Sequence, residues 1–196
     1  MNIHNCNKYN FESIELTKPL KEHDYYYSDI NFLIQTPKLP ILKLNKNTLT
    51  LNINTELEQC ISEFDKNMIN LISNNSEEYF KESFTSDEID DIYKSSIKIN
   101  KNKLNTFNCA YSDNLTIFKK NKSTLSISDL NIDNDIICLL KCSKIIFYKT
   151  YCMPYWEIIQ IKLKEIKIEQ KVYLFKEDAF DDYVESNNNF KLINFN

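Results

Sequence analysis

The chain contains no glycine and no arginine: all 24 basic residues are lysine, and only four of the 196 residues are proline. Phosphate-binding loops, dinucleotide-binding turns and nucleophile elbows need glycine where the backbone has positive φ or approaches a ligand closely, so the sequence argues against these enzyme classes. Arginine is the residue whose planar fork grips phosphate and guanine with two hydrogen bonds. Because arginine is absent, we expect lysine contacts that tolerate any base sequence, and base-specific recognition is less expected.

Histidine and cysteine are too sparse or too scattered for a metal centre. The two histidines, His4 and His23, lie in the polar N-terminal part, and the six cysteines form no CxxC pair. Neither zinc spacing nor a disulfide framework is visible. Acidic pairs such as Asp90-Asp91 and Asp181-Asp182 lie in solvated, locally acidic stretches, which is the usual place for charges without a catalytic role. We therefore expect no enzyme, no cofactor and no metal, with the thiols as core filler.

The chain has no apolar run near the roughly 20 residues needed to span a bilayer, so we expect no membrane contact. Asparagine, isoleucine and lysine, which A/T-rich codons encode, dominate the composition and indicate an AT-rich genome. A content of 42% hydrophobic and 13% aromatic residues predicts a folded chain of about one domain. The net charge of −4 disfavours a generally basic nucleic-acid binder, although a global sum can conceal a basic face.

The hydrophobic pattern predicts three regions: a polar N-terminal segment (1–29), a single β-rich domain (30–177) and an acidic, polar tail (178–196). Within the domain, a helical insertion is expected at about 55–95. The order of strands, helical insertion and many further strands predicts an α+β, mainly β fold, built as a barrel or a curled antiparallel sheet.

The individual elements follow from periodicity. Thr55 and Glu58 form a capping-box pattern before a helix whose apolar positions recur every three or four residues, and a second helix is expected from about Ser86. Asn45–Asn47 is predicted to turn a hairpin with asparagine in left-handed geometry. Strands are predicted at 30–36, 42–44, 49–53, 97–99, 106–111, 115–118, 124–127, 137–148, 155–168 and 172–175, with Ile159, Ile161 and Leu163 as a core row opposite Lys162 and Lys164.

Lysines interleave with aromatic residues in two stretches, 101–122 and 141–156. Single-stranded nucleic acid is held by this combination, because bases stack on rings while ammonium groups neutralise phosphates. The competing interpretation is that the rings are core residues and the lysines a solvated face. The candidates are Trp156, Tyr155, Tyr151 and Phe118 for stacking, and Lys119, Lys120, Lys149, Lys162 and Lys164 for phosphate contacts. The acidic tail would compete with phosphates for these lysines.

Two segments resemble a known family. Phe32-Leu33-Ile34-Gln35-Thr36-Pro37-Lys38 is similar to an "(L/I)IQTP" element, and 145–149 through Tyr155-Trp156-Glu157-Ile158-Ile159-Gln160-Ile161-Lys162 is similar to a closing "W-x-(V/I)-x-Q" element. Both occur in a family from nucleocytoplasmic large DNA viruses that is related to phage-type single-stranded-DNA-binding proteins. The chain departs from the pattern in having Met153-Pro154 where the family has glycine, in its acidic helical insertion and in the weakly acidic final residues 190–196.

The resemblance implies an OB-like barrel with an acidic tail and no cofactor. It also implies sequence-tolerant binding of single-stranded DNA in viral DNA replication, recombination or repair. Expected partners are single-stranded DNA and, through the tail, viral replication proteins; a homo-oligomer is left open. The expected location is the host cytoplasm, in a viral factory, or the virion. The alternative function is a virion structural or assembly protein that acts through protein contacts.

Overall fold

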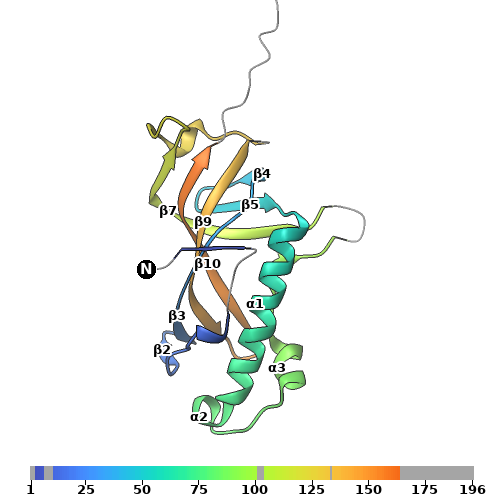
Figure 1. Cartoon of the computed structure of the whole chain (residues 1–196). Coiled ribbons are helices and arrows are strands. Elements are labelled where there is room, and N and C mark those ends of the chain that lie inside the picture. Colours follow the sequence, from blue (N-terminus) through green and yellow to red (C-terminus); the bar gives the residue numbers. More distant parts are fainter. Residues whose placement is uncertain (1–2, 7–10, 101–103, 133, 164–196) are drawn as a thin grey trace, which may run out of the picture. The chain divides into compact units, whose positions relative to one another are not determined.

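The computed structural model describes residues 3–6, 11–100, 104–132 and 134–163 (Figure 1). The chain divides into a compact unit of residues 1–166 and a second unit of residues 167–196. The predicted tail (178–196) and the predicted strand 172–175 lie outside the described residues, as does the end of the strand predicted at 155–168.

Ten strands, three α-helices and two short 3-10 turns make up the described part of the chain. The strands are β1 (His4–Asn5), β2 (Leu20–Glu22), β3 (Tyr25–Gln35), β4 (Leu39–Leu44), β5 (Thr48–Asn52), β6 (Ile97–Lys98), β7 (Thr106–Phe118), β8 (Thr124–Leu125), β9 (Asp135–Phe147) and β10 (Cys152–Leu163). The helices are α1 (Thr55–Asn74), α2 (Ser76–Phe80) and α3 (Ser86–Ile92), and the 3-10 turns are η1 (Phe11–Ser13) and η2 (Ile127–Asp129).

Five of the strands close into a barrel. The hydrogen-bonded order β9-β10-β7-β5-β4 returns to its start because β4 also pairs with β9, through Leu39 opposite Ile136. All neighbours in this ring are antiparallel except β7 and β10, which run parallel. A five-stranded barrel with this Greek-key order is OB-like. The predicted mainly β, OB-like architecture with a helical insertion is therefore confirmed, and the insertion follows the second barrel strand.

The sheet continues beyond the barrel through the N-terminal part of the chain. β3 pairs with β9, and β3 in turn carries β1 and β2. Because β3 begins at Tyr25, and Cys6 and Ile14 are buried in the core, the boundary predicted at residue 30 does not separate a segment from the domain. The sequence signal for this part was weak because only a few of its residues face the core.

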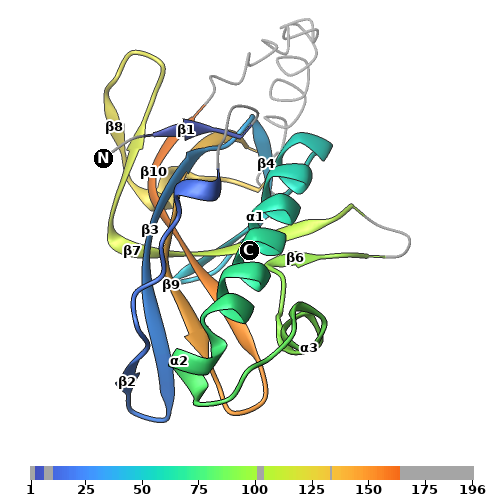
Figure 2. The ribbon, with the colours of Figure 1, turned by 60° about the horizontal axis from the view of Figure 1, so that its bottom comes forward.

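Helix α1 lies across the sheet (Figure 2), and its apolar side chains are buried in the core between them. Phe64 of α1 stacks on Phe32 of β3 at a ring-centroid distance of 5.0 Å and contacts Trp156 of β10 at 5.1 Å. Phe107 of β7 meets the same Trp156 ring edge-on at 5.7 Å. These four rings, contributed by α1 and three strands, form the centre of the core.

The first helix begins where the sequence predicts, but with a different cap. Asn54, whose Oδ1 accepts a hydrogen bond from the Leu57 N–H at 3.0 Å, is the N-cap residue, and Thr55 is the first residue inside the helix. The capping box is found instead at α3, where Thr85 and Glu88 satisfy each other's backbone N–H groups. The prediction of Thr55 as N-cap is therefore wrong by one residue, because asparagine serves this position as well as threonine does.

The hairpin between β4 and β5 turns without left-handed asparagine. Among the described residues only His23, Lys81 and Lys122 have positive φ. The Asn45 backbone N–H donates to Thr48 O at 2.9 Å, and its side chain donates to Thr48 Oγ1 at 3.1 Å. These hydrogen bonds hold the turn while all its residues keep negative φ, so the prediction of left-handed geometry there is wrong.

Two strand predictions also need correction. The strands predicted at 106–111 and 115–118 are one continuous strand, β7, and the strand predicted at 124–127 ends at Leu125 before η2.

In β10 a register shift between Ile158 and Gln160 changes which side chains face inward. Ile158 and Ile161 are buried, whereas Ile159 is 40% exposed, so Ile159 does not join the predicted core row.

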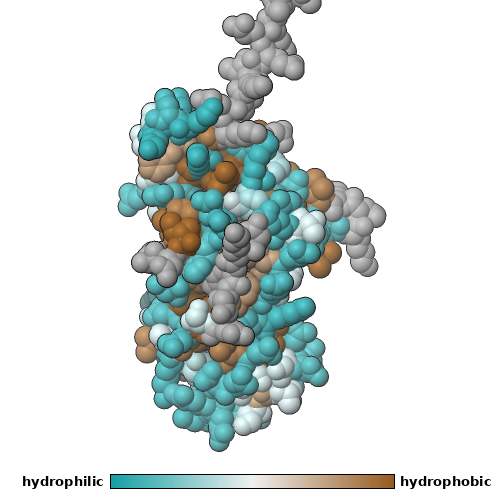
Figure 3. All heavy atoms as spheres, viewed as in Figure 1, coloured by the Kyte–Doolittle hydropathy of each residue, from teal (hydrophilic) through white to brown (hydrophobic). Residues whose placement is uncertain are grey.

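On the face shown in Figure 3, hydrophobic residues form small patches separated by hydrophilic ones. Within the ranges that the structure describes, no helix is both long and apolar enough to cross a membrane.

Candidate functional site

A pocket of about 410 Å³ lies at the end of the barrel where β7 and β10 end and β9 begins. Its lysines are Lys119, Lys120, Lys122 and Lys162. Its other lining residues are mainly apolar: Ile3, Gln35, Phe118, Ile137, Cys138, Leu139, Gln160 and Ile161. No carboxylate is among these described lining residues. We call this site the lysine pocket.

Three of the four pocket lysines come from the tight turn between β7 and β8. The Lys119 N–H donates to Ser123 O at 2.8 Å, and the Lys122 N–H donates to Lys119 O at 3.0 Å. Lys122 takes the left-handed conformation (φ 66°) that glycine would otherwise fill, and the Asn121 side chain accepts from the Ser123 N–H at 3.1 Å. The turn therefore crowds ammonium groups beside the fourth lysine, Lys162, at the end of β10.

The residues of this pocket suit a ligand that combines an aromatic ring with negative charge. Lys119, Lys120, Lys122 and Lys162 are all exposed and Phe118 is half-buried beside them. An apolar floor with several cations at its rim can hold a base against the floor and its phosphates at the rim. Four of the nine candidates from the sequence, Phe118, Lys119, Lys120 and Lys162, are brought together here.

Three tyrosines gather at the other end of the β9–β10 pair, at the turn that joins these strands. Tyr148 stacks on Tyr151 at 4.6 Å, and Tyr25 packs on Tyr148 at 5.7 Å. Lys94, from the segment after α3, places its ammonium 3.5 Å from the centre of the Tyr151 ring. Lys149 is exposed in the same turn. We call Tyr25, Tyr148, Tyr151 and Lys94 the tyrosine cluster.

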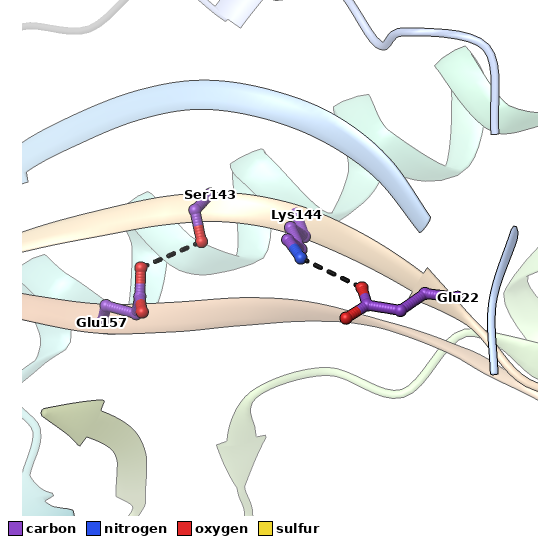
Figure 4. Close-up of polar contacts among 4 residues, drawn as sticks. All are labelled: Glu22, Ser143, Lys144 and Glu157. Atoms are coloured by element: carbon purple, nitrogen blue, oxygen red, sulfur yellow. Dashed lines mark hydrogen bonds and ion pairs between the residues drawn. The ribbon is translucent and has the colours of Figure 1, made fainter. Parts of the chain in front are cut away.

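Between these two sites, polar contacts tie the strands together on the outer face of the sheet (Figure 4). Ser143 donates to Glu157 at 3.1 Å, and Lys144 pairs with Glu22 of β2 at 3.3 Å while lying 4.0 Å from the Tyr27 ring centre. Burial lowers the pKa of Lys144, but the hydrogen bond and the charge of Glu22 together raise it above its ordinary value. Tyr155 is half-buried and lies opposite Lys144 in the strand register.

Trp156 is not available for stacking. Its side chain is 3% exposed and is enclosed by Phe32, Phe64 and Phe107, so neither face of the ring is open to a base. The prediction of Trp156 as a stacking residue is therefore contradicted by its burial. Trp156 lies on the side of β10 that faces the core, so the competing interpretation, that this ring is a core residue, is the one that applies to it. Lys164 lies outside the described residues.

Sequence reasoning missed several residues that these sites contain. Lys122 lines the lysine pocket beside its predicted neighbours, and Tyr25, Tyr148 and Lys94 complete the tyrosine cluster. The run Tyr25-Tyr26-Tyr27 was a visible signal. Side chains alternate between the two faces of a strand, so three consecutive rings cannot all lie on the buried face. No local pattern indicated Lys94, because its contact depends on the pairing of the segment after α3 with Cys152 at the start of β10.

The outer side of the second and third barrel strands, β5 and β7, differs from the lysine pocket and the tyrosine cluster in its side chains. This side is the usual oligonucleotide-binding face of OB barrels. Here it presents short polar residues such as Thr50 and Asn108, whose side chains hydrogen-bond to each other at 2.8 Å. The lysine pocket lies instead at the end of β7, at the β7–β8 turn and at the end of β10, and the tyrosine cluster lies at the β9–β10 turn.

The cysteines behave as predicted for core filler: all six are buried and free. Burial raises the pKa of the Cys152 thiol to about 12. Across the described ranges, no three His, Cys, Asp or Glu side chains are grouped so that they could hold a metal ion.

A family of unknown function, DUF5871, matches residues 39–182, from the first barrel strand onward. The chain belongs to this family. No curated protein matches its sequence.

Among solved structures, the crystal structure of gp2.5, a single-stranded DNA binding protein encoded by bacteriophage T7, is similar at 13% identity and a TM-score of 0.47, over 83% of this chain and 100% of that one. The single-stranded DNA-binding protein from bacteriophage Enc34 is similar at 9% identity and a TM-score of 0.44, over 85% and 99% of the two chains. The same Enc34 protein in complex with single-stranded DNA gives 7% identity and a TM-score of 0.41, over 79% and 97%. The strand pairings of this chain by themselves define its barrel.

Proposed function

We propose that this protein binds single-stranded DNA with little regard to base sequence, and that the lysine pocket is a primary contact. The observation that carries the proposal is the convergence of four lysines, one accessible aromatic ring and an apolar floor in one pocket of about 410 Å³. Residues spread over β7, the following turn and β10 meet there, which favours a binding site over a merely solvated surface.

The chemistry of the pocket gives each residue a role. Phe118 offers its ring to a base, and Ile137 and Leu139 of β9 contribute apolar side chains to the lining. The lysines neutralise the flanking phosphates as point charges, without the paired geometry that arginine would impose. Because stacking and phosphate contacts are both blind to base identity, binding is expected to tolerate any sequence.

The setting that we propose for this activity is the replication, recombination or repair of a viral genome, in a viral factory of the host cytoplasm or in the virion. The sequence resemblance to the viral family supports this setting. A role of the acidic residues after 177 in contacting replication proteins, or in competing with DNA, remains a prediction from the sequence.

The test is fluorescence anisotropy of the full-length protein with labelled mixed-sequence DNA oligonucleotides at several salt concentrations. Four neutralised phosphates predict a slope of about −3 for log K against log salt, at about −0.7 per phosphate on single strands. Replacing Lys119 and Lys162 by alanine should reduce this slope by about 1.4 and weaken binding to all sequences alike. The matched control is Lys66→Ala on α1, which removes an exposed lysine away from the pocket.

Three outcomes would contradict the proposal. One is the absence of binding at low salt, and another is an affinity that salt does not change. The third is a loss of affinity for Lys66→Ala that reaches half of the loss for the pocket variant, which removes two lysines; this would mean that only the net charge matters.

A further inference from the structure

We propose that the tyrosine cluster is a second contact for the same DNA strand, in which a base displaces Lys94 from the Tyr151 ring. This inference rests on the proposed function and extends it to the opposite end of β9 and β10. Tyr148 covers one face of the Tyr151 ring at 4.6 Å, and the Lys94 ammonium lies over the ring at 3.5 Å. Lys94 thus occupies the kind of position that a stacked base would take.

The two ends are joined by one continuous face of the sheet. Side chains alternate along a strand, so the half-buried Leu139, Lys141 and Tyr155 lie opposite to the buried side chains beside them. Leu139 lines the lysine pocket, Lys141 follows it two residues along β9, and Tyr155 of β10 comes four residues after Tyr151 in the chain. A strand leaving the pocket therefore meets Lys141 and Tyr155 before it reaches the cluster, and it also passes Glu157, which lies opposite Lys141 in the strand register.

The length of β10 sets how much DNA this path can hold. Its 12 residues extend about 40 Å at about 3.3 Å per residue. A stretched strand advances at most about twice the 3.4 Å per nucleotide of duplex DNA, so at least about six nucleotides are needed to cover the distance. This number lies within the range of about 4–16 nucleotides that one OB barrel commonly occupies.

Exchange at Lys94 is favourable because the two interactions differ in strength. A lysine over an exposed ring is held more weakly than a base stacked on a ring, and the released ammonium gains a phosphate beside that base. Lys144 sits over Tyr27 in a similar way, but Glu22 also holds it at 3.3 Å. Lys144 therefore stays in place and serves as an internal control within the same protein.

The direct test is nuclear magnetic resonance of the full-length protein with ¹³C-labelled lysine side chains. An ammonium over a ring gives ring-current-shifted methylene signals, so Lys94 and Lys144 should both be recognisable in the free protein. Addition of a ten-nucleotide oligothymidylate should return the Lys94 signal to its ordinary position and leave Lys144 unchanged, whereas a four-nucleotide oligomer should move neither. A Lys94 signal that stays shifted while the ten-nucleotide strand is bound overturns the inference.

An affinity series with the same two oligonucleotides tests the energetic consequence. Tyr151→Leu should weaken binding of the ten-nucleotide strand about tenfold, as the loss of one stacked base predicts, without changing binding of the four-nucleotide strand. Tyr151→Phe keeps the ring and should behave as the unmodified protein does. Equal affinities of Tyr151→Leu and the unmodified protein for the longer strand would overturn this inference alone. If the unmodified protein bound neither strand, the proposed function itself would fail.

Discussion

Asp65 of α1 is a buried carboxyl group whose replacement by asparagine should stabilise the protein at neutral pH. The side chain lies in the core at 6% exposure, where it accepts hydrogen bonds from Tyr93 Oη at 2.8 Å and from Ser95 Oγ at 2.5 Å. Burial raises its pKa from 3.8 to about 6, and the two hydroxyl donors only partly oppose this rise. The charged form is thus less stable in the folded protein than in the unfolded chain.

The magnitude and the pH window follow from these two values. A pKa of about 6 in place of 3.8 corresponds to about 3 kcal/mol at neutral pH. Because the folded-state pKa is raised, the contribution of this group to stability is fully present below about pH 3.8 and is lost as the pH rises through about 6. An asparagine side chain at this position would not titrate, and its amide can accept from Tyr93 while donating to Ser95.

The assay is urea unfolding of the full-length protein and of Asp65→Asn between pH 4 and 8. The free energy of unfolding of the variant should exceed that of the unmodified protein by an amount that grows from near zero at pH 4 to about 3 kcal/mol above pH 7. Tyr93→Phe is the control: it removes one donor from the carboxylate, so its destabilisation should be larger at pH 7 than at pH 4. A difference between Asp65→Asn and the unmodified protein that does not change with pH would refute the reasoning.

Three further predictions concern stability. Trp156→Ala should cost about 3–5 kcal/mol in urea unfolding, and the fluorescence of this single tryptophan should change little when DNA binds; strong quenching would place the ring at the interface. Asn54→Ala should cost about 0.5–2 kcal/mol of unfolding free energy through the lost cap, whereas Thr55→Ala should be nearly neutral, and the reverse order would restore Thr55 as the cap. Lys81 follows α2 in the left-handed conformation (φ 64°). Lys81→Gly should therefore raise the free energy of unfolding by about 0.5–1 kcal/mol, and a lower melting temperature of this variant would contradict the prediction.

Much of the local structure could be predicted because periodicity reflects which face of an element is buried. The apolar positions of α1 that the sequence indicates include Leu57, Phe64 and Met68, and all three are fully buried. The strand predicted before Pro37 ends at Gln35, close to the predicted end, and proline has no backbone N–H to donate to the ladder at this position. Lys119 and Lys120 of the β7–β8 turn were recognisable as candidates because lysines interleave with aromatic residues in this stretch.

Where prediction failed, a feature remote in sequence decided the outcome. The bulge in β10 is set by its pairing with β7 and β9, and it buries Ile161 three residues after Ile158, so Ile159 stays exposed although alternation counted back from Ile161 would bury it. The same pairing turns Trp156 toward α1, which lies about ninety residues earlier in the chain. A candidate list drawn from one stretch of sequence cannot separate Trp156 from Tyr155, because adjacent residues of a strand face opposite sides.

By itself, the sequence determined the class of fold, the helical insertion and the kinds of side chain available, since these depend on composition and on spacing within one element. Only the tertiary structure decided that β4 closes on β9, that Phe118 and Lys162 share one pocket, and that Lys94 lies on Tyr151. These contacts join residues 44 to 97 positions apart. They follow from the register of paired strands and from the docking of helices, which no local pattern encodes.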